Sequence, residues 1–430
     1  MQKSTCYRAA VISITLLLQS ISVFASVETT DAEGIKYGVI NEVSKEASVL
    51  GYTKDSESVK IPASIVIDDE EYMVTEIGDQ AFENCYTLKE IELPSTLQTI
   101  RYMAFGHCGS LIRISMPESV TTIENWAFEA CTSLKEVEFS PSLKFIGSHA
   151  FDNCTAIEEI TLPDSLEEIS TYAFNECEAL SSVVLPKGIQ AINQSTFFEC
   201  KALTYIPLPE GLLKLDHGAF GYCTSLKEIT LPKSLQSIET GVFDSCNSLE
   251  AIYSLATTPP TTYSSAFNRL DFNSIDVYVP GESRYTYSLY NGWNRFPDFI
   301  AIKSIEGNEY SLTVGNTQLL EATIPAFVSD IKWESSQPEI ATIEANGLLT
   351  AKDAGVCQIS LTLTDVYGYE STQKASVKVT KESGVEDIEV NAEDGAKYFT
   401  LQGIPIEKES LKAGIYIVIK DGRADRIVVR

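Results

Sequence analysis

Basic residues and histidines are scarce in this chain of 430 residues. Lysine and arginine total 32 against 60 aspartates and glutamates, which gives a net charge of −28, and only three histidines occur. Such an excess of negative charge repels phosphate backbones and anionic lipid headgroups. The composition therefore argues against nucleic-acid binding and against peripheral membrane binding.

Motifs that carry chemistry are also missing. The sequence has no Gly-x-Ser-x-Gly, no His-Glu-x-x-His, no phosphate-binding loop and no EF-hand-type ligand spacing. Acidic pairs such as Glu158-Glu159 and Glu167-Glu168 favour a solvated surface over a glycosidase site, because neighbours on a strand point to opposite faces. The sequence therefore predicts no enzyme, with no catalytic residues, metal site or cofactor.

No apolar run reaches the roughly 20 residues that a transmembrane helix needs. Near the N-terminus, Lys3 and Arg8 lead into an apolar run from Ala9 to Leu18, and Val23-Phe24-Ala25 follows. A basic start, a short apolar segment and small residues are typical of a secretory signal peptide. We expect residues 1–25 to be removed and the mature chain to be secreted or held at the outer cell surface.

A period of 23 residues organises the middle of the chain. Eight cysteines follow it: Cys85, Cys108, Cys131, Cys154, Cys177, Cys200, Cys223 and Cys246. A phenylalanine precedes each cysteine by three positions, from Phe82 to Phe243, and a leucine or isoleucine follows each by three positions. A fixed period of this length predicts a solenoid, in which each coil buries its apolar face against its neighbours.

Each coil is expected to contain one short strand and one tight turn. Residues 88–93 alternate apolar and polar side chains, and Pro94 ends the strand because it cannot donate a ladder hydrogen bond. The Ala-Phe-x-x-Cys segment has helical spacing and is expected to turn on the opposite side. We expect an N-terminal β cap over 26–80 and a solenoid over 81–300, with a C-terminal cap made by Tyr285, Tyr290, Trp293 and Phe296.

The cysteine row allows three interpretations. An even number of cysteines in an exported chain fits disulfides. Equivalent positions on adjacent coils are ~4.8 Å apart with parallel side chains, which suits a disulfide poorly. Zinc needs ligands that converge on one point, and a linear row does not converge. The geometry favours a ladder of buried free thiols over both alternatives.

Candidate binding residues come from positions that face outward on the predicted strands. Early coils place charged residues there, whereas later coils place aromatic and apolar ones. Exposed aromatic side chains on a rigid sheet are good contact anchors. We therefore predict a ligand-binding patch on the sheet face, and its residues are Val184, Tyr205, Pro207 and Tyr253. Variation without functional consequence is the competing interpretation.

Two smaller modules follow the repeats. Alternating segments between about 303 and 381 predict a small β-sandwich with Trp333 in its core. Residues 384–430 form a third piece, which contains Leu401-Gln402-Gly403 and Gly414 to Val418. The fold class is therefore mainly β: a solenoid of about 23-residue coils with short helical turns, followed by a β-sandwich.

The repeat unit, Ala-Phe-x-x-Cys-x-x-Leu-x-x-Ile-x-Leu-Pro, resembles the BspA-like leucine-rich repeats. Ile331-Lys332-Trp333-Glu334, with Ile340 to Ile343 and Gly347-Leu348, resembles the bacterial Ig-like group 2 domain, and residues 384–430 resemble C-terminal sorting tails of Gram-negative secreted proteins. A β-hairpin packed on the Ig-like domain is the alternative for this last segment.

These resemblances imply an adhesin-like secreted or surface protein that binds an extracellular or host protein, with the Ig-like domain as a spacer. A glycan-binding accessory protein, with tyrosine and tryptophan rings stacked on sugars, is the alternative. A structural role in surface layers also stays open.

Overall fold

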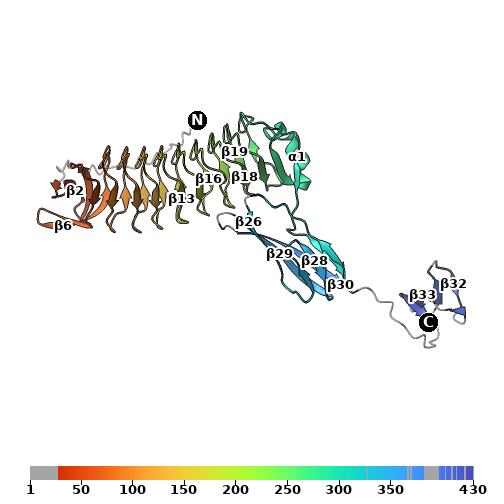
Figure 1. Cartoon of the computed structure of the whole chain (residues 1–430). Coiled ribbons are helices and arrows are strands. Elements are labelled where there is room, and N and C mark those ends of the chain that lie inside the picture. Colours follow the sequence, from red (N-terminus) through yellow and green to blue (C-terminus); the bar gives the residue numbers. More distant parts are fainter. Residues whose placement is uncertain are drawn as a thin grey trace, which may run out of the picture. The chain divides into compact units, whose positions relative to one another are not determined.

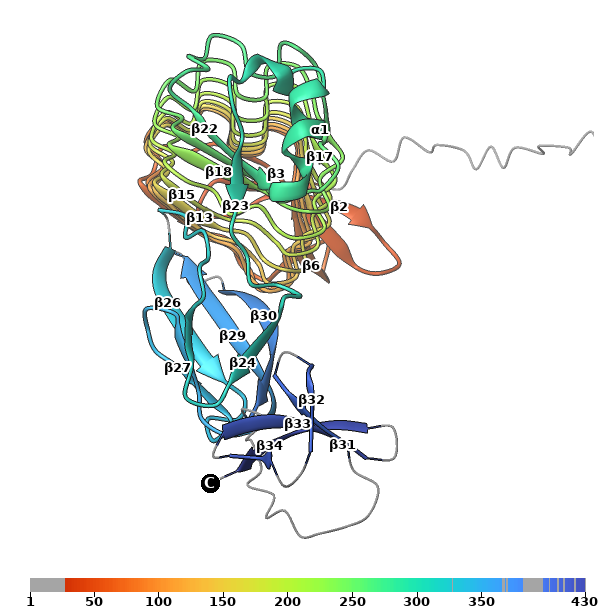
Figure 2. The same cartoon turned by 90° about the vertical axis from the view of Figure 1, so that its right-hand side faces the viewer.

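The computed structural model describes residues 28–326, 328–365, 368, 370–381, 397–401, 403–407, 410–412, 414–420 and 423–429. The predicted signal peptide lies outside the described residues. The chain divides into two compact units between Ile302 and Lys303. The first unit is a solenoid, and Figure 2 looks along it, so that its successive coils superpose.

Short strands lie on two sides of most coils, and within each sheet they pair in parallel with strands of the adjacent coils (Figure 1). The coil that contains Tyr205 has no strand on the first side. The first side, which we call the strand row, contains β4 (Ser58–Lys60), β7 (Glu90–Glu92), β9 (Arg113–Ser115), β11 (Glu136–Glu138), β13 (Glu159–Thr161), β15 (Ser182–Val184), β18 (Glu228–Leu231), β20 (Ala251–Ser254), β22 (Asp276–Pro280) and β23 (Ile300–Ile302). The second side, the return row, contains β8 (Thr99–Ile100), β10 (Thr122–Ile123), β12 (Phe145–Ile146), β14 (Glu168–Ile169), β16 (Ala191–Ile192), β17 (Lys214–Leu215), β19 (Ser237–Ile238) and β21 (Thr261–Thr262).

The register between neighbouring coils equals one sequence period. Ile114 on β9 lies opposite Val137 on β11, and Ile100 on β8 lies opposite Ile123 on β10. Equivalent residues therefore stack directly, which confirms the predicted solenoid of 23-residue coils. The strand row extends further than predicted, because β23 adds a strand after β22.

The Ala-Phe-x-x-Cys segment forms a turn that alternates in backbone handedness, and this corrects the expected helical turn. In the coil of Phe128, Trp126 and Ala130 have φ angles of 57° and 55°, and every coil from Phe82 to Phe243 has positive φ at the same two positions. The alternation points amide groups in two directions. The Phe128 amide donates to Ala150 O of the next coil at 2.8 Å, whereas the Cys131 amide donates to Phe128 O at 3.2 Å.

The core of the solenoid contains a continuous stack of the repeat phenylalanines. Neighbouring rings have centroids 5.0 to 6.1 Å apart and interplanar angles of at most 15°. Tyr52 packs on Phe82 at the first end, and Trp293 and Phe296 pack on Phe267 at the other. Each phenylalanine therefore buries both faces against its neighbours, as stacked coils require.

The N-terminal cap consists of β1 (Glu28–Thr30), β2 (Ile35–Asn41), β3 (Glu46–Tyr52), β5 (Ser64–Ile67) and β6 (Glu70–Ile77). Strand β6 joins β3 to β8 of the first coil, so the cap extends the sheet of the return row. Asp68 and Asp69 have φ angles of 50° and 63° at the hairpin between β5 and β6. This geometry is the two-residue hairpin turn that favours aspartate and asparagine.

The C-terminal cap consists of η1 (Gly281–Ser283), α1 (Arg284–Leu289) and η2 (Trp293–Arg295). Trp293 and Phe296 are buried as predicted, and Tyr290 is partly buried against the core. Tyr285 was predicted to cover the end, but it lies on the outer face of α1 and is 75% exposed. Tyr287, two residues further along α1, is buried instead and donates its hydroxyl to Ala256 O at 2.8 Å.

The second unit contains an Ig-like sandwich of two sheets, in the orders β24-β30-β29-β26 and β25-β28-β27. The strands are β24 (Glu309–Thr313), β25 (Thr317–Leu319), β26 (Val328–Ser335), β27 (Ala341–Ile343), β28 (Leu348–Ala351), β29 (Gly355–Asp365) and β30 (Glu370–Thr380). Trp333 is half-buried and packs against the core. Gly347 has a φ of 85°, and a Cβ there would lie 2.6 Å from Leu320 O, so the turn requires glycine.

Residues after 396 form a separate small sheet, in the order β32-β31-β33-β34. Its strands are β31 (Lys397–Thr400), β32 (Pro405–Ile406), β33 (Gly414–Lys420) and β34 (Arg423–Val429), all paired antiparallel. The segment is thus larger than the β-hairpin considered as an alternative. Its role in sorting stays a prediction.

Candidate functional site

Val184 and Tyr253 lie on strands β15 and β20 of the strand row, whereas Tyr205 and Pro207 lie in the coil between β15 and β18, which forms no strand there. The exposure of these residues differs from the expectation. Tyr205 and Tyr253 are each 7% exposed, and Val184 and Pro207 are half-buried. The Tyr253 ring stacks on Tyr278 of the next strand, with centroids 4.6 Å apart. Burial, together with the nearby Glu228 carboxylate, raises the pKa of Tyr253 well above its ordinary value. The prediction that these tyrosines present exposed rings is therefore wrong.

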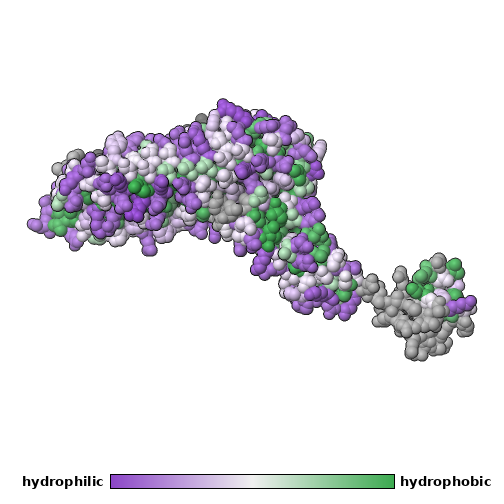
Figure 3. Space-filling model, in the orientation of Figure 1, coloured by the Kyte–Doolittle hydropathy of each residue, from purple (hydrophilic) through white to green (hydrophobic). Residues whose placement is uncertain are grey.

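The early coils of the strand row follow the predicted alternation. The outer residues of β7, β9 and β13 are exposed and their central residues are buried. Neighbouring coils exchange polar contacts across this face: Arg113 pairs with Glu90 at 3.0 Å, and Ser115 donates to Glu138 at 2.6 Å. Hydrophilic residues predominate over these coils on the face shown in Figure 3. The face is charged and already paired along its length.

A row of aromatic side chains runs along the turn edge of the solenoid. The Trp126 and His149 rings are stacked with centroids 5.0 Å apart, and His149 stacks on Tyr172 at 4.6 Å. Tyr102 meets Trp126 edge to face at 5.6 Å. We call Tyr102, Trp126, His149 and Tyr172 the turn-edge aromatic row. All four are partly or well exposed.

Polar contacts fix the row in place. His149 Nδ1 lies 2.7 Å from Asp152 Oδ2, and Gln194 Nε2 donates to the Tyr172 hydroxyl at 2.7 Å. Because His149 stacks on Trp126 with one face and on Tyr172 with the other, its ring edge rather than its faces is available at the surface. The row therefore offers a rigid apolar contact strip with polar groups at its border, which is the composition of a protein-binding hot spot.

Carboxylates flank the row. Glu129 and Asp152 occupy equivalent positions on adjacent coils, and His107 lies 3.9 Å from Glu129. Burial raises the pKa of Glu129, His107 opposes this shift, and Asp152 adds to it. The turn edge thus combines ring edges with negative charge.

Sequence reasoning missed this row, although its signal is present. Trp126, His149 and Tyr172 follow the period of 23 and lie two positions before the repeat phenylalanine. They were missed because the Ala-Phe-x-x-Cys segment was interpreted as a helical turn, and a helical turn gives no reason to expect that equivalent side chains of neighbouring coils stack. In the structure, these three residues have the left-handed backbone conformation, and their side chains do stack.

The nine cysteines among the described residues are free, and the repeat cysteines are hydrogen-bond donors. From Cys108 to Cys246, each thiol donates to the carbonyl oxygen of the phenylalanine 26 residues earlier, over 3.0 to 3.3 Å. Burial raises the pKa of the thiols of Cys200 and Cys223 well above the ordinary value. The structure confirms the ladder of buried free thiols and adds a bond that the sequence did not indicate.

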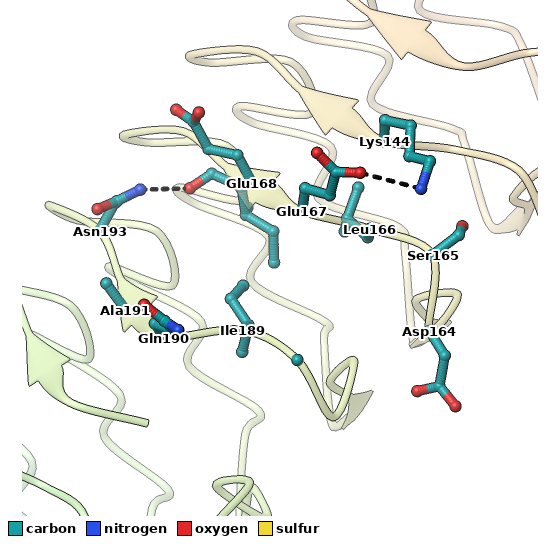
Figure 4. Close-up of a pocket in the computed structure, with 12 residues that line it drawn as sticks. Lys144, Asp164, Ser165, Leu166, Glu167, Glu168, Ile189, Gln190, Ala191 and Asn193 are labelled. Carbon is teal, nitrogen blue, oxygen red and sulfur yellow. Dashed lines mark hydrogen bonds and ion pairs between the residues drawn. The ribbon is translucent and has the colours of Figure 1, made fainter. Parts of the chain in front are cut away.

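A groove opens on the return row between β14 and β16 (Figure 4). Its volume is about 550 Å³. Its lining is Lys144, Asp164, Ser165, Leu166, Glu167, Glu168, Ile169, Gly188, Ile189, Gln190, Ala191 and Asn193. Lys144 pairs with Glu167 at 2.9 Å, so one cation faces three carboxylates.

The part of the chain that the structure describes contains no group of three or more histidine, cysteine, aspartate or glutamate side chains able to hold a metal ion. Within the same residues, no helix has the length and apolar content to span a membrane.

Comparisons with known proteins agree with this architecture. The BspA-type leucine-rich repeat model matches residues 57–181 and 167–291 with six copies, and the bacterial Ig-like domain (group 2) model matches residues 300–376. No curated protein sequence matches the chain.

Several solved structures are similar. A leucine-rich repeat protein of T. pallidum is 32% identical over 46% of this chain and 90% of its own, with a TM-score of 0.43. One from Bacteroides ovatus ATCC 8483 is 28% identical over 58% and 70%, with a TM-score of 0.47. A leucine-rich cell surface protein of Faecalibacterium prausnitzii A2-165 is 20% identical over 66% and 88%, with a TM-score of 0.43.

The repeat model spans more than half of the chain, and each coil from Phe82 to Phe243 carries the repeat phenylalanine and cysteine. This protein belongs to the BspA-type leucine-rich repeat family, and it carries a group 2 bacterial Ig-like domain after the repeats.

Proposed function

We propose that this chain is an adhesin-like cell-surface protein that binds a protein partner through the turn-edge aromatic row. The observation that carries the proposal is the row itself: four partly or well exposed aromatic rings, held by stacking on a rigid solenoid. Pre-ordered aromatic side chains lose little conformational freedom on binding, which makes them effective anchors.

Surface location is part of the same proposal. The N-terminal segment has the composition of a signal peptide, and one similar structure is a cell surface protein. The Ig-like module would then act as a spacer that holds the solenoid away from its attachment point. The net charge of −28 favours partners with basic surfaces.

The ring geometry separates a protein ligand from a glycan. Sugar binding by aromatic residues uses an open ring face, but both faces of His149 are covered by Trp126 and Tyr172. Side chains of a protein can pack against ring edges and pair with Asp152 or Glu129. A protein partner therefore fits the row better than a polysaccharide does.

A binding screen tests the proposal. Residues 26–430 are presented to extracellular-matrix proteins and to a glycan array, and affinity for any partner is measured by surface plasmon resonance. The double variant Trp126→Ala/Tyr172→Ala should weaken protein binding about tenfold or more. Tyr285→Ala removes an exposed tyrosine from α1 and serves as the matched control.

Three results would contradict this assignment. Binding to sugars alone would favour the glycan alternative. Loss of protein binding in Tyr205→Ala/Tyr253→Ala, with Trp126→Ala/Tyr172→Ala unchanged, would return the site to the strand row. Turnover on a panel of hydrolase substrates would contradict the prediction that the chain is no enzyme.

A further inference from the structure

The junction between β14 and β16 lacks the backbone hydrogen bonds that join other coils along the return row. One coil earlier, the amides of Glu167 and Ser170 donate to Lys144 O and Ile146 O, each over 2.9 Å. One coil later, the amides of Leu213 and Asp216 donate to Gln190 O and Ile192 O over 2.8 and 2.9 Å.

Within the continuously described residues 28–326, the corresponding bonds from Gln190 to Glu167 and from Asn193 to Ile169 do not form. The sheet of the return row accordingly ends at β14, and a new sheet starts at β16. The Asn193 side chain replaces one bond, because its Nδ2 donates to Ile169 O at 2.7 Å (Figure 4). We call this junction the seam.

A missing hydroxyl accompanies the seam. At three other junctions, a serine two positions after the repeat proline bridges to the preceding coil. Ser119 donates to Leu97 O at 2.6 Å, Ser165 to Leu143 O at 2.7 Å, and Ser234 to Leu212 O at 2.7 Å. Gly188 occupies this position at the seam and offers no donor to Leu166 O. Its φ is not positive and a Cβ there would meet no atom within 4 Å, so the backbone does not require glycine. Gly211 occupies the same position one coil after the seam, where the backbone bonds form without a hydroxyl.

The same two coils remain joined elsewhere. On the strand row, β13 and β15 pair in register with Ile160 opposite Val183. At the turn, the Phe174 amide donates to Thr196 O at 3.0 Å. The seam is therefore an opening on the return row alone. The bond from Asn193 to Ile169 O bounds it at one end, and the Lys187 amide, which donates to Asp164 Oδ1 at 3.2 Å, bounds it at the other.

The opening has the character of a peptide groove. Its floor is apolar, since Leu166, Ile169 and Ile189 line it. Its rim carries Asp164 and Glu168 together with the Lys144–Glu167 ion pair, and Lys187 lies 3.9 Å from Asp164. The Glu167 carbonyl and the Gln190 amide have no backbone partner across the seam. A volume of about 550 Å³ lies within the range of ligand-binding clefts.

We propose that the seam binds an extended, positively charged segment of a partner polypeptide. The segment lies along the groove, donates a backbone amide to Glu167 O and accepts a hydrogen bond from the Gln190 amide, as in strand addition to a sheet edge. Alternate side chains contact the apolar floor, and basic side chains reach Asp164 and Glu168. Charge complementarity favours this occupant, because the lining and its rim hold three carboxylates against the two lysines Lys144 and Lys187.

This site shares no residue with the turn-edge aromatic row, so the two proposals fail separately. The test uses the full chain and two capped synthetic peptides, one alternating lysine and valine and the other alternating glutamate and valine. We expect saturable binding of the lysine peptide that weakens with salt, no binding of the glutamate peptide, and slower amide hydrogen exchange at Gln190 in the complex.

Gly188→Ser provides the decisive variant, because it adds the hydroxyl that bridges the coils at three other junctions. It should close the seam, slow exchange of the Gln190 amide without peptide, and weaken lysine-peptide binding about tenfold while the Trp126→Ala/Tyr172→Ala variant binds normally. Asp164→Asn/Glu168→Gln should weaken binding several-fold and reduce its salt dependence. The proposal is overturned if the wild-type chain does not bind the lysine peptide, or if neither seam variant weakens binding.

Discussion

At the residue scale, the cysteine of each repeat contributes a hydrogen bond as well as a side chain that fills space in the core. The carbonyl oxygen of Phe128, for example, accepts a bond from the Cys131 amide of its own coil and another from the Cys154 thiol of the next coil. Every repeat phenylalanine from Phe82 to Phe220 accepts such a thiol bond from the next coil. Alanine would fill part of the same space but would not donate. The thiol therefore links consecutive coils inside the core, where no water replaces it.

Removing one such donor should cost stability. We expect Cys154→Ala to lower the free energy of unfolding by about 1 kcal/mol for the lost hydrogen bond, plus the lost burial of sulfur. Cys85→Ala is the matched control, because Cys85 is half-buried and has no repeat phenylalanine in a preceding coil. Urea unfolding checks the prediction, and equal losses in the two variants would contradict it.

A second prediction at the residue scale concerns the carboxyl group of Glu129. Burial raises its pKa, so the ionised carboxylate destabilises the folded state at neutral pH. Glu129→Gln should therefore raise the melting temperature at pH 7. The difference should shrink as the pH falls through the raised pKa and vanish below about pH 4, where folded and unfolded chains are both protonated. This account would be contradicted if Glu129→Gln left the melting temperature at pH 7 unchanged, or if its gain in melting temperature persisted at low pH.

At the element scale, the turn of each coil depends on two residues in the left-handed conformation. Most of them are not glycine, although glycine adopts this conformation at the least cost. The surrounding inter-coil hydrogen bonds hold them there, and the aromatic row gains its alignment from the same positions.

A substitution at Ala130 measures the energetic cost of the left-handed conformation for a residue other than glycine. Its φ is 55°, so Ala130→Gly should raise the free energy of unfolding by about 0.5 to 1 kcal/mol. Ala127 lies in the same turn, is buried and does not have a positive φ, so Ala127→Gly should lower the stability instead. Chemical denaturation of both variants is the measurement, and a loss in Ala130→Gly would show that the turn does not store this strain.

The sequence predicted the structural features for which the same residue types recur in successive coils. The period predicted the stacked coils, the phenylalanine core and the free thiols, because a buried position has to be filled in the same way in every coil. It did not predict where coils separate or which outer residues are covered. Gly188 and Tyr253 look unremarkable in the sequence, and only the hydrogen bonds and packing around them distinguish the seam and the buried strand face.

At the scale of the whole molecule, two hydrophobic cores support two compact units. We expect two unfolding transitions in calorimetry. Leu361→Ala removes a fully buried side chain of the Ig-like core and should lower the stability of that unit by about 2 to 5 kcal/mol, leaving the solenoid transition in place. In a Trp333→Phe background, tryptophan fluorescence reports only Trp126 and Trp293 of the solenoid, and a shift of that signal by Leu361→Ala would contradict independent units.

The repeated pattern of hydrogen bonds between coils determines how the solenoid can change in length. Partners in its coil-to-coil bonds stand a fixed distance apart in sequence, as Phe82 and Ala104 do, so the gain or loss of one whole coil preserves the frame of every remaining bond. Extra residues within a coil have to be accommodated outside the phenylalanine stack, as in the last coil, where Phe267 follows Phe243 by one residue more than the period and still stacks on it. Duplication of whole coils would thus extend the reach of such a protein in increments of ~4.8 Å without requiring a new fold.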